Sequence, residues 1–289
     1  MKNILVPIDF SECSLNAAEA AAQLAREHNG KVHFAYFIEI LVVYGEFPTQ
    51  MNVEQFNIES YKEYYNAKFG GLKLAEWNHG FEAHYHAEIQ NVSQGILDKA
   101  EDLGCDLIVM GTTGATGMKE YVIGSNTAKV VRLSEIPVIA VKQPVKDFGI
   151  KDVLFVSNFY GEVEQTFKDE IIPFLSPFDP TYHMLKVITP SNFEPSYRTL
   201  KVMDDFVEIT GLNKFTVNIY NDDSIEDGIK NFMDLTNYDM VVMPTHGKSV
   251  FAQLLNRSET EKVINHVDVN LLSLHINEPA YEPGPVFYK

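Results

Sequence analysis

The chain has 289 residues, 45% of them hydrophobic and 22% charged, which is the composition of an ordinary globular protein and a length typical of two domains. Its formal net charge is −17, from 40 acidic and 23 basic residues, and this argues against a broad surface for nucleic acid or anionic membranes. No apolar run is long enough to span a membrane, and a strand begins directly after Lys2 in place of a signal peptide, so we expect a cytoplasmic protein. Because Cys13 and Cys105 are far apart and lack metal-ligand spacing, we expect no disulfide framework.

Both halves of the chain alternate β-rich apolar runs with segments of helical periodicity. In the first half, strands are predicted near residues 2–8, 31–38, 81–87, 106–110 and 137–142, and helices near 14–28, 53–78, 92–103 and 125–133. In the second half, strands are predicted near 151–156, 181–188, 214–220, 239–243 and 269–274, and helices near 162–175, 196–210, 224–236 and 258–266. This alternation predicts an α/β fold with open parallel sheets covered by helices on both faces, and ligands then bind beyond the carboxyl ends of the strands.

The two halves are related as an internal repeat. Residues 92–139 superpose on 225–272 with a constant offset of 133 and no gap. The openings of the two copies correspond at an offset of 149, so the first copy is longer by 16 residues in its middle. We therefore predict tandem domains at residues 1–143 and 150–276, joined by a linker that contains Pro and Gly and followed by a C-terminal tail, residues 277–289.

A glycine-rich segment follows the apolar strand at residues 107–110 and opens the helix at Ser125. It reads Gly111-Thr-Thr-Gly114, then nine residues, then Gly124-Ser125. Glycines let the backbone approach an anion closely, and a helix N-terminus offers unpaired N–H groups and a positive dipole end. The segment therefore predicts a phosphate cradle. The alternative is structural: the glycines shape the exit of the strand, and Ser125 only caps a helix.

This segment resembles the ATP-binding signature of the universal stress protein family, Gly-x2-Gly-x9-Gly-(Ser/Thr), with every fixed position filled. The opening, Asn3-Ile-Leu-Val-Pro-Ile-Asp9-Phe-Ser-Glu-Cys-Ser14, is similar to that family's first strand and the acidic loop after it. The resemblance implies two tandem domains of the adenine nucleotide alpha-hydrolase-like fold. Because single-domain members commonly dimerise through their last strand, it also implies an intrachain pseudo-dimer with residues 138–141 beside 271–274, and it leaves a further homodimer open.

The first copy carries a full set of candidate nucleotide-binding residues. Asp9 can accept hydrogen bonds from a ribose hydroxyl or an adenine amino group, and its alternative role is to cap the following helix. Pro7, Met110 and either Phe37 or Ile38 would form an apolar slot for the base. The phosphates would meet the N–H and hydroxyl groups of Gly111, Thr113, Gly114, Gly124, Ser125, Asn126 and Thr127. Relatives often have His or Arg at the position of Thr113, so one cationic contact is missing.

The second copy departs from this set where it matters. Asn158 replaces Asp9, Pro244 replaces Gly111 and Arg257 replaces Gly124. Proline removes an N–H, and an arginine side chain takes the opening where a phosphate would lie against the backbone. We therefore expect the second copy not to bind ATP. Arg257 either recruits another small anion together with His246 and Lys248 or fills the empty pocket.

Two other motifs are weaker. Gly247-Lys-Ser249 resembles the end of a P-loop, but the glycine required five positions earlier is Val242, inside a strand. His84 and His86 point to one face of a strand and could share a metal ion, but no third ligand is evident, so no metal site is predicted.

The leading hypothesis is a stress-responsive regulatory protein that binds ATP, or AMP or ADP, in its first domain, as the resemblance implies. No residue stands out as a catalytic base, so turnover is at most slow ATP hydrolysis, which would need Mg²⁺. An adenylating enzyme would need a Ser-Gly-Gly-type loop where this chain has Asp9-Phe-Ser-Glu-Cys-Ser14. The remaining alternative is a ligand-free scaffold. The regulated process and the protein partner are not predicted.

Overall fold

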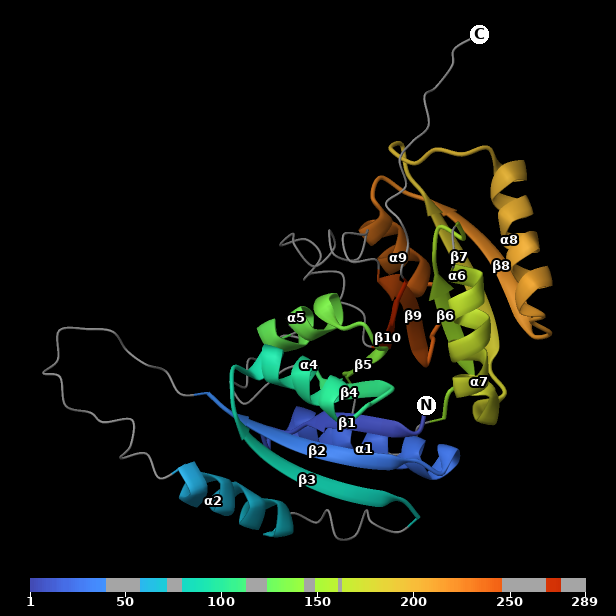
Figure 1. Ribbon diagram of the computed structural model, residues 1–289. Helices are drawn as coiled ribbons and strands as arrows, with labels where there is room; N and C mark the ends of the chain where they lie inside the picture. Colours follow the sequence, from blue (N-terminus) through green and yellow to red (C-terminus); the bar gives the residue numbers. More distant parts are fainter. Residues whose placement is uncertain are drawn as a thin grey trace, which may run out of the picture. The chain divides into compact units, whose positions relative to one another are not determined.

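The computed structural model describes residues 1–39, 58–71, 80–112, 124–142, 149–160, 163–245 and 269–276. The chain divides into two compact units (Figure 1). Unit 1 comprises residues 1–149 and 264–272, and unit 2 comprises residues 150–263 and 273–289. The strand β10 (Asn270–His275) is shared between them at residues 272 and 273. The pairing expected between residues 138–141 and 271–274 stays a prediction.

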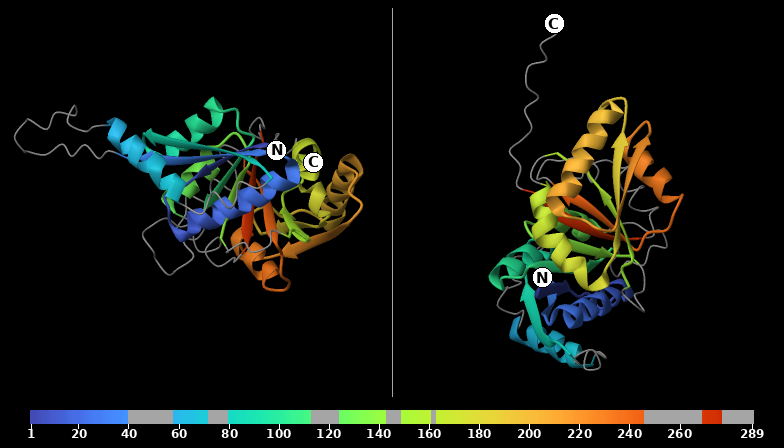
Figure 2. Two further views of the ribbon diagram at one scale, coloured as in Figure 1. Left: turned by 90° about the horizontal axis from the view of Figure 1, so that it is seen from below. Right: turned by 90° about the vertical axis from the view of Figure 1, so that its right-hand side faces the viewer.

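Unit 1 contains a parallel sheet with helices on both faces. Its strands are β1 (Asn3–Pro7), β2 (Lys31–Ile38), β3 (Glu82–Ile89), β4 (Leu107–Gly111) and β5 (Val138–Val141). They lie in the order β3-β2-β1-β4-β5, and every neighbouring pair is parallel. Its helices are α1 (Glu12–His28), α2 (Ile58–Gly71), α4 (Val92–Asp102) and α5 (Ser125–Leu133). The helices α1 and α2 lie on one face of the sheet and α4 and α5 on the other (Figures 1 and 2).

The buried strands and the first helix explain how this sequence folds. Ile4, Leu5 and Val6 of β1 are fully buried, as expected for a central strand that is covered on both faces. The helix α1 packs on the sheet through a face of small alanines, and the hydroxyl of its N-cap, Ser11, accepts a hydrogen bond from the N–H of Ser14. At its other end Asn29 has left-handed backbone with φ 50°, which closes the helix before β2.

Unit 2 follows the same plan with a different first helix. Its described strands are β6 (Asp152–Val156), β7 (Thr181–Ile188), β8 (Phe215–Asn221) and β9 (Met240–Thr245), in the parallel order β9-β6-β7-β8. Its helical segments are α6 (Val163–Thr166), the π-helix η2 (Phe167–Ile171), α7 (Ile172–Leu175), the 3₁₀ helix η3 (Ser176–Phe178), α8 (Ser196–Thr210) and α9 (Ile225–Met233). The segments from α6 to α8 lie on one face of the sheet and α9 on the other (Figure 1).

Equivalent positions of the two copies make the same local contacts. The carboxylate of Asp106 accepts hydrogen bonds from the backbone N–H groups of Lys2 and Asn3, and that of Asp239 accepts them from Lys151 and Asp152. In each copy a carboxylate therefore fixes the start of the first strand against the start of the fourth.

The predicted α/β architecture is confirmed, and most element bounds agree with the prediction. The helix predicted at 162–175 is interrupted, however, by η2, where the N–H of Ile172 donates to the carbonyl of Phe167 five residues back. Pro173, which has no N–H and crowds the preceding turn, follows immediately and accounts for the widened turn. The helix predicted at 53–78 is described at 58–71, and the predicted helix at 258–266 and tail at 277–289 lie outside the described residues.

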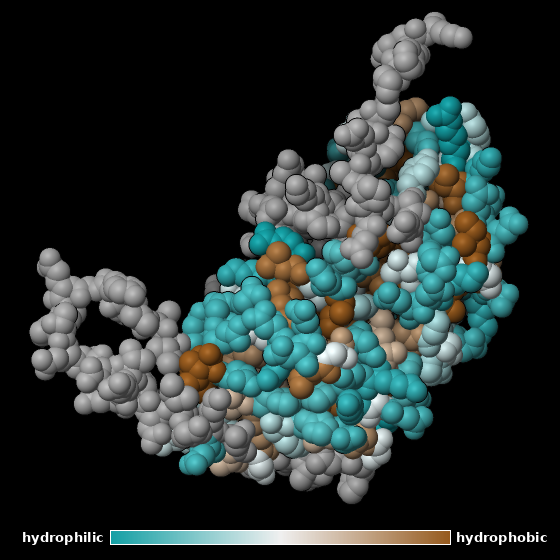
Figure 3. Space-filling view, viewed as in Figure 1, coloured by the Kyte–Doolittle hydropathy of each residue, from teal (hydrophilic) through white to brown (hydrophobic). Residues whose placement is uncertain are grey.

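One face of the surface can be judged by its hydropathy. The face drawn in Figure 3 carries mainly hydrophilic residues, with hydrophobic residues in scattered patches. Across the described ranges, no helix combines the length and the apolar character needed to cross a membrane.

Candidate functional site

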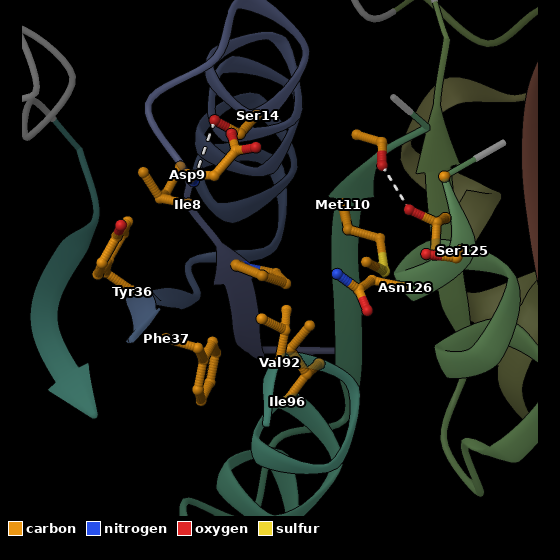
Figure 4. A pocket seen from close by; sticks show the side chains of 14 residues that line it. Ile8, Asp9, Ser14, Tyr36, Phe37, Val92, Ile96, Met110, Ser125 and Asn126 are labelled. Atoms are coloured by element: carbon orange, nitrogen blue, oxygen red, sulfur yellow. Dashed lines mark hydrogen bonds between the residues drawn. The ribbon is translucent and has the colours of Figure 1, made fainter. Parts of the chain in front are cut away.

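A cavity of about 380 Å³ opens at the carboxyl ends of β1, β2 and β4 in unit 1 (Figure 4). It is lined by Pro7, Ile8, Asp9, Ser14, Tyr36, Phe37, Val92, Ile96, Met110, Gly111, Gly124, Ser125, Asn126 and Thr127. Of the eleven predicted site residues, Thr113 and Gly114 lie outside the described residues, and all the others line this cavity. Of the two alternative neighbours Phe37 and Ile38, Phe37 is among the residues that line it.

One side of the cavity is an apolar slot. Phe37 of β2 and Met110 of β4 face Val92 and Ile96, which project from the first turns of α4 (Figure 4). The helix α4 sits this close because Gly95 has no side chain: a Cβ there would lie 2.6 Å from Cδ1 of Phe37. The slot can therefore hold a flat apolar group.

The opposite side carries a carboxylate held in a tight turn. Oδ1 of Asp9 accepts hydrogen bonds from the N–H of Ser11 at 2.9 Å and from its hydroxyl at 2.5 Å. Between them Phe10 adopts left-handed backbone with φ 64°, which is rare for a bulky residue. Its ring packs on Tyr36 and Phe69, with centroid distances of 5.4 Å to each, and this aromatic packing holds the turn. Ser11, and not Asp9, is therefore the N-cap of α1, while Asp9 holds that cap residue in place and also lines the cavity.

The N-terminus of α5 forms the third wall. Gly124 is the N-cap, with φ −58° and ψ 147°, and makes no side-chain cap. Its N–H donates to the carbonyl of Thr112, and the hydroxyl of Thr127 donates to the carbonyl of Gly111 at 2.8 Å. These two bonds hold the helix end against the end of β4. The first N–H groups of a helix have no intrahelical acceptor and carry positive partial charge, so this wall favours an anion.

The side chain of Asn126 has a defined orientation. The hydroxyl of Ser93, which is 4% exposed, donates to Oδ1 of Asn126 at 2.9 Å. The amide nitrogen of Asn126 is consequently the group that faces the cavity, beside Met110 and Val92 (Figure 4). The junction of the apolar slot and the helix end therefore presents a hydrogen-bond donor.

Tyr36 connects the cavity to α2. Its hydroxyl donates to the hydroxyl of Tyr65 at 3.1 Å, and the two rings stack with centroids 3.9 Å apart. Burial first, and then the hydrogen bond with Tyr65, raise the pKa of Tyr36, so the phenol stays neutral. It supplies an aromatic surface to the cavity.

The electrostatics of the cavity depend on backbone groups. The lining residues that the structure describes include the carboxylate of Asp9 but no Lys, Arg or His. An anion bound there would therefore be held by the N–H groups and dipole of α5 rather than by a described cationic side chain.

The first strand of unit 2 ends in the same type of turn as that of unit 1, but the polar groups at its strand ends differ. Oδ1 of Asn158 accepts a hydrogen bond from the N–H of Tyr160 at 3.0 Å, and Phe159 between them has φ 62°. Pro244 lies in β9 at the position of Gly111. His246, Lys248 and Arg257 lie outside the described residues.

Sequence reasoning missed five lining residues: Ile8, Ser14, Tyr36, Val92 and Ile96. Val92 and Ile96 are apolar residues four positions apart at the start of a predicted helix, and this spacing was the available signal. Tyr36 and Phe37 are neighbours on β2, so their side chains point to opposite faces of the sheet. Both line the cavity because it lies at the carboxyl end of this strand.

Comparisons with known proteins agree with this fold. The model of the Universal stress protein family matches residues 1–142 and 214–275. Universal stress protein MJ0531 of Methanocaldococcus jannaschii is 33% identical over 147 residues, covering 50% of this chain and 85% of that protein. Universal stress protein YxiE of Bacillus subtilis is 30% identical over 146 residues, covering 48% of this chain and 97% of that protein. A crystal structure of a universal stress protein from Archaeoglobus fulgidus, 19% identical, matches with a TM-score of 0.68 over 94% of this chain and 96% of that one, which shows the shared fold.

Proposed function

Because the chain belongs to the universal stress protein family, we propose that it is a regulatory protein that binds one adenine nucleotide in the cavity of unit 1. One observation carries this proposal: an apolar slot, a carboxylate and a helix N-terminus line a single cavity of about 380 Å³. This volume lies within the roughly 300–1,000 Å³ that is usual for small-molecule sites.

Each part of a nucleotide has a matching wall. The base enters the slot between Phe37, Met110 and Ile96, where its faces are removed from water. The carboxylate of Asp9 accepts a hydrogen bond from a ribose hydroxyl or an exocyclic amino group. The phosphates lie at the end of α5, beside Gly124 and Ser125, where N–H groups are the donors. Thr113 and Gly114 are proposed to complete this wall.

The proposal assigns binding to unit 1 alone. In unit 2, Pro244 supplies no N–H and Asn158 supplies no negative charge at the corresponding strand ends. We further propose that bound nucleotide is not turned over efficiently, since Asp9 is the only carboxylate among the described lining residues and already bonds with Ser11. Mg²⁺ enters the proposal only as a counterion of a triphosphate.

Mass spectrometry of ligand released from denatured, freshly purified protein tests the proposal, together with ATP, ADP and AMP titration calorimetry on the stripped protein with and without Mg²⁺. We expect about one adenine nucleotide per chain, as the assignment to unit 1 requires. Two nucleotides per chain would refute the assignment of unit 2. No released nucleotide, no binding heat and an unchanged melting temperature with all three ligands would refute nucleotide binding.

A ligand-free scaffold is the second candidate function, and two contacts favour it. Gly111 is needed for the packing of α1 even without a ligand, because a Cβ at this position would lie 2.7 Å from the backbone of Cys13. The hydroxyl of Thr127 already bonds with the carbonyl of Gly111. Both residues thus have structural uses without a ligand, and the calorimetry above separates the two functions.

The orientation of Asn126 leads to a prediction within the proposed site. Replacing Asn126→Asp keeps the acceptor for Ser93 but turns the donor in the cavity into a carboxylate oxygen. We expect ATP affinity to fall about tenfold to 100-fold, the effect of losing a hydrogen bond to a charged or polar group while adding a repulsive charge. Calorimetry with ATP measures this loss of affinity. The same measurement with adenosine shows whether the amide of Asn126 contacts the nucleoside or only the phosphates.

The matched control is Asn213→Asp, which adds the same charge at an exposed position of unit 2, between α8 and β8. We expect it to leave both affinities unchanged. Equal ATP affinity of the Asn126→Asp variant and the wild-type protein would show that this side chain does not face the ligand.

A further inference from the structure

Three imidazoles gather on the outer edge of the sheet in unit 1, apart from the cavity. His33 of β2 is paired in register with His84 of β3, the edge strand, and His86 follows two residues later on the same face. The ring of His33 stacks on that of His84 with centroids 4.8 Å apart and lies 5.3 Å from that of His86. His33 is 6% exposed, so its ring is almost removed from water.

The hydrogen bonds of Asn3 fix the tautomer of His33. The amide nitrogen of Asn3 donates to the carbonyls of Leu103 and Gly104, at 2.7 and 3.0 Å, so Oδ1 is the atom that faces Nε2 of His33 at 2.8 Å. Nε2 of His33 must therefore carry the hydrogen, and Nδ1 has a lone pair. Nδ1 lies 3.1 Å from Nε2 of His86, which then is the donor.

A single proton thus occupies the gap between His33 and His86. Protonation of His33 would put a second N–H into that gap or force His86 to exchange its tautomer. Either change leaves a positive charge on the buried ring of His33, beside two other imidazoles, which is costly because burial disfavours the charged form.

The charged groups around the cluster add to this cost or oppose it. Lys31 of β2 and Lys99 of α4 disfavour further positive charge, while Glu82 and Glu88 of β3 favour it. Glu88 is paired with Lys99 at 2.6 Å, and Glu82 with His84 at 2.6 Å. The strand β1 contributes the neutral Asn3.

The net result is that His33, which is buried, and His86, which is half-buried, both resist protonation. Burial, followed by the neighbouring His86 and His84, lowers the pKa of His33 to about 4. Burial and the nearby Lys99 also lower the pKa of His86. In the unfolded chain a histidine has a pKa of about 6.5. As the pH falls, the unfolded chain therefore takes up protons at a higher pH than folded unit 1 does.

We propose that His33 and His86 form an acid-sensitive lock on the edge of unit 1, which is closed when these two imidazoles are neutral and is broken by acidification. The stability that it supplies is complete above about pH 6.5, falls as the pH decreases and is lost near pH 4. The strand β2 also carries Phe37, which lines the cavity four residues beyond His33, so the lock supports the wall of that cavity. This inference does not rest on the proposed nucleotide.

The second unit contains a natural comparison. His183 of β7 occupies the position of His33, but its partners are Oγ1 of Thr216 at 3.0 Å and Oδ1 of Asp152 at 2.9 Å. The imidazole of unit 2 thus bonds to a hydroxyl and a carboxylate and not to a second imidazole. The lock is therefore assigned to unit 1 alone, and His183 provides a matched control.

Thermal unfolding of the full chain at about pH 7 and about pH 5, with a chelator present, tests the lock. His86→Gln keeps a side-chain N–H that can donate to Nδ1 of His33 but cannot titrate. We expect acidification to lower the melting temperature of the wild-type protein by about 2–4 °C more than that of His86→Gln, a difference in the usual range for a domain of this size. His183→Gln should show the full wild-type decrease. An equal decrease in the wild-type protein and His86→Gln would overturn the proposal.

A titration of the imidazole NMR signals of the wild-type protein keeps the test independent of any variant that fails to fold. The chain has nine histidines. We expect the signals of His33 and His86, assigned in the wild-type protein through their mutual contacts, to titrate below pH 6.5, that of His33 near pH 4. Titration of both near pH 6.5 would overturn the lock even if the melting temperatures agreed with it.

Discussion

Replacing Gly124→Arg should abolish adenine-nucleotide binding while unit 1 stays folded. Gly124 lines the cavity as the N-cap of α5, with φ −58°, which any residue can adopt, so the backbone tolerates the substitution. The long arginine side chain would occupy the space in which the phosphates approach the N-terminus of α5. We expect at least an approximately 100-fold loss of ATP affinity, or about 2.7 kcal/mol, measured by calorimetry on the stripped protein.

The internal repeat supplies the control for this variant. Arg257 stands at the position of Gly124 in the second copy, and Arg257→Ala should leave ATP affinity unchanged because we assign no nucleotide to unit 2. Circular dichroism and the melting temperature without ligand should match the wild-type protein in both variants. Full ATP binding by Gly124→Arg would remove the N-terminus of α5 from the proposed site.

Replacing Gly111→Ala should destabilise unit 1 strongly, with or without a ligand. A Cβ at this position would lie 2.7 Å from the backbone carbonyl carbon and oxygen of Cys13, and backbone cannot move aside as the end of a side chain can. The start of α1 would have to shift away from β4. We expect a loss of about 3 kcal/mol, at the upper end of the usual cost of overpacking, measured as the midpoint and slope of urea unfolding.

Gly70→Ala in α2 is the matched control for Gly111→Ala. Apart from its own helix and chain neighbours, no atom of the described residues lies within 4 Å of a Cβ built at Gly70, and alanine favours a helix over glycine by about 1 kcal/mol. We expect equal or slightly higher stability for this variant. A Gly111→Ala variant as stable as the wild-type protein would show that α1 and β4 separate easily, and its ATP affinity would then report on the cradle alone.

The architecture was predictable because the central strands are continuous apolar runs. Ile4 to Val6 and Leu107 to Met110 are buried, so their composition alone marks them as strands covered on both faces. The interruption by η2 was harder to foresee, since Pro173 is compatible with the first turn of a new helix as well as with a widened turn in an old one. Periodicity alone does not distinguish the two.

The candidate site was predictable in part, because glycine spacing is local while packing is not. The motif from Gly111 to Ser125 led to residues that the fold does bring together around the cavity. The role of Gly95 could not be read from its neighbours in the chain, since it depends on Phe37 lying across from it in the folded unit. For the same reason the contact between His86 and His33 could not be predicted. The sequence shows that His84 and His86 lie on one face of a strand, but it does not show the strand register that places His33 beside them.

The turns after β1 and β6 have the same main-chain shape although their polar side chains differ. Asn158 receives the same type of turn hydrogen bond as Asp9, and Phe159 has the left-handed backbone of Phe10, although Asn158 carries no charge. A left-handed phenylalanine carries a conformational cost of about 1–3 kcal/mol, which the aromatic packing of each unit offsets whether or not a ligand binds. The shape of this turn therefore does not require the charge of Asp9. A single substitution at position 158 would place a carboxylate in the same turn, whereas the missing N–H at Pro244 is a property of the main chain itself.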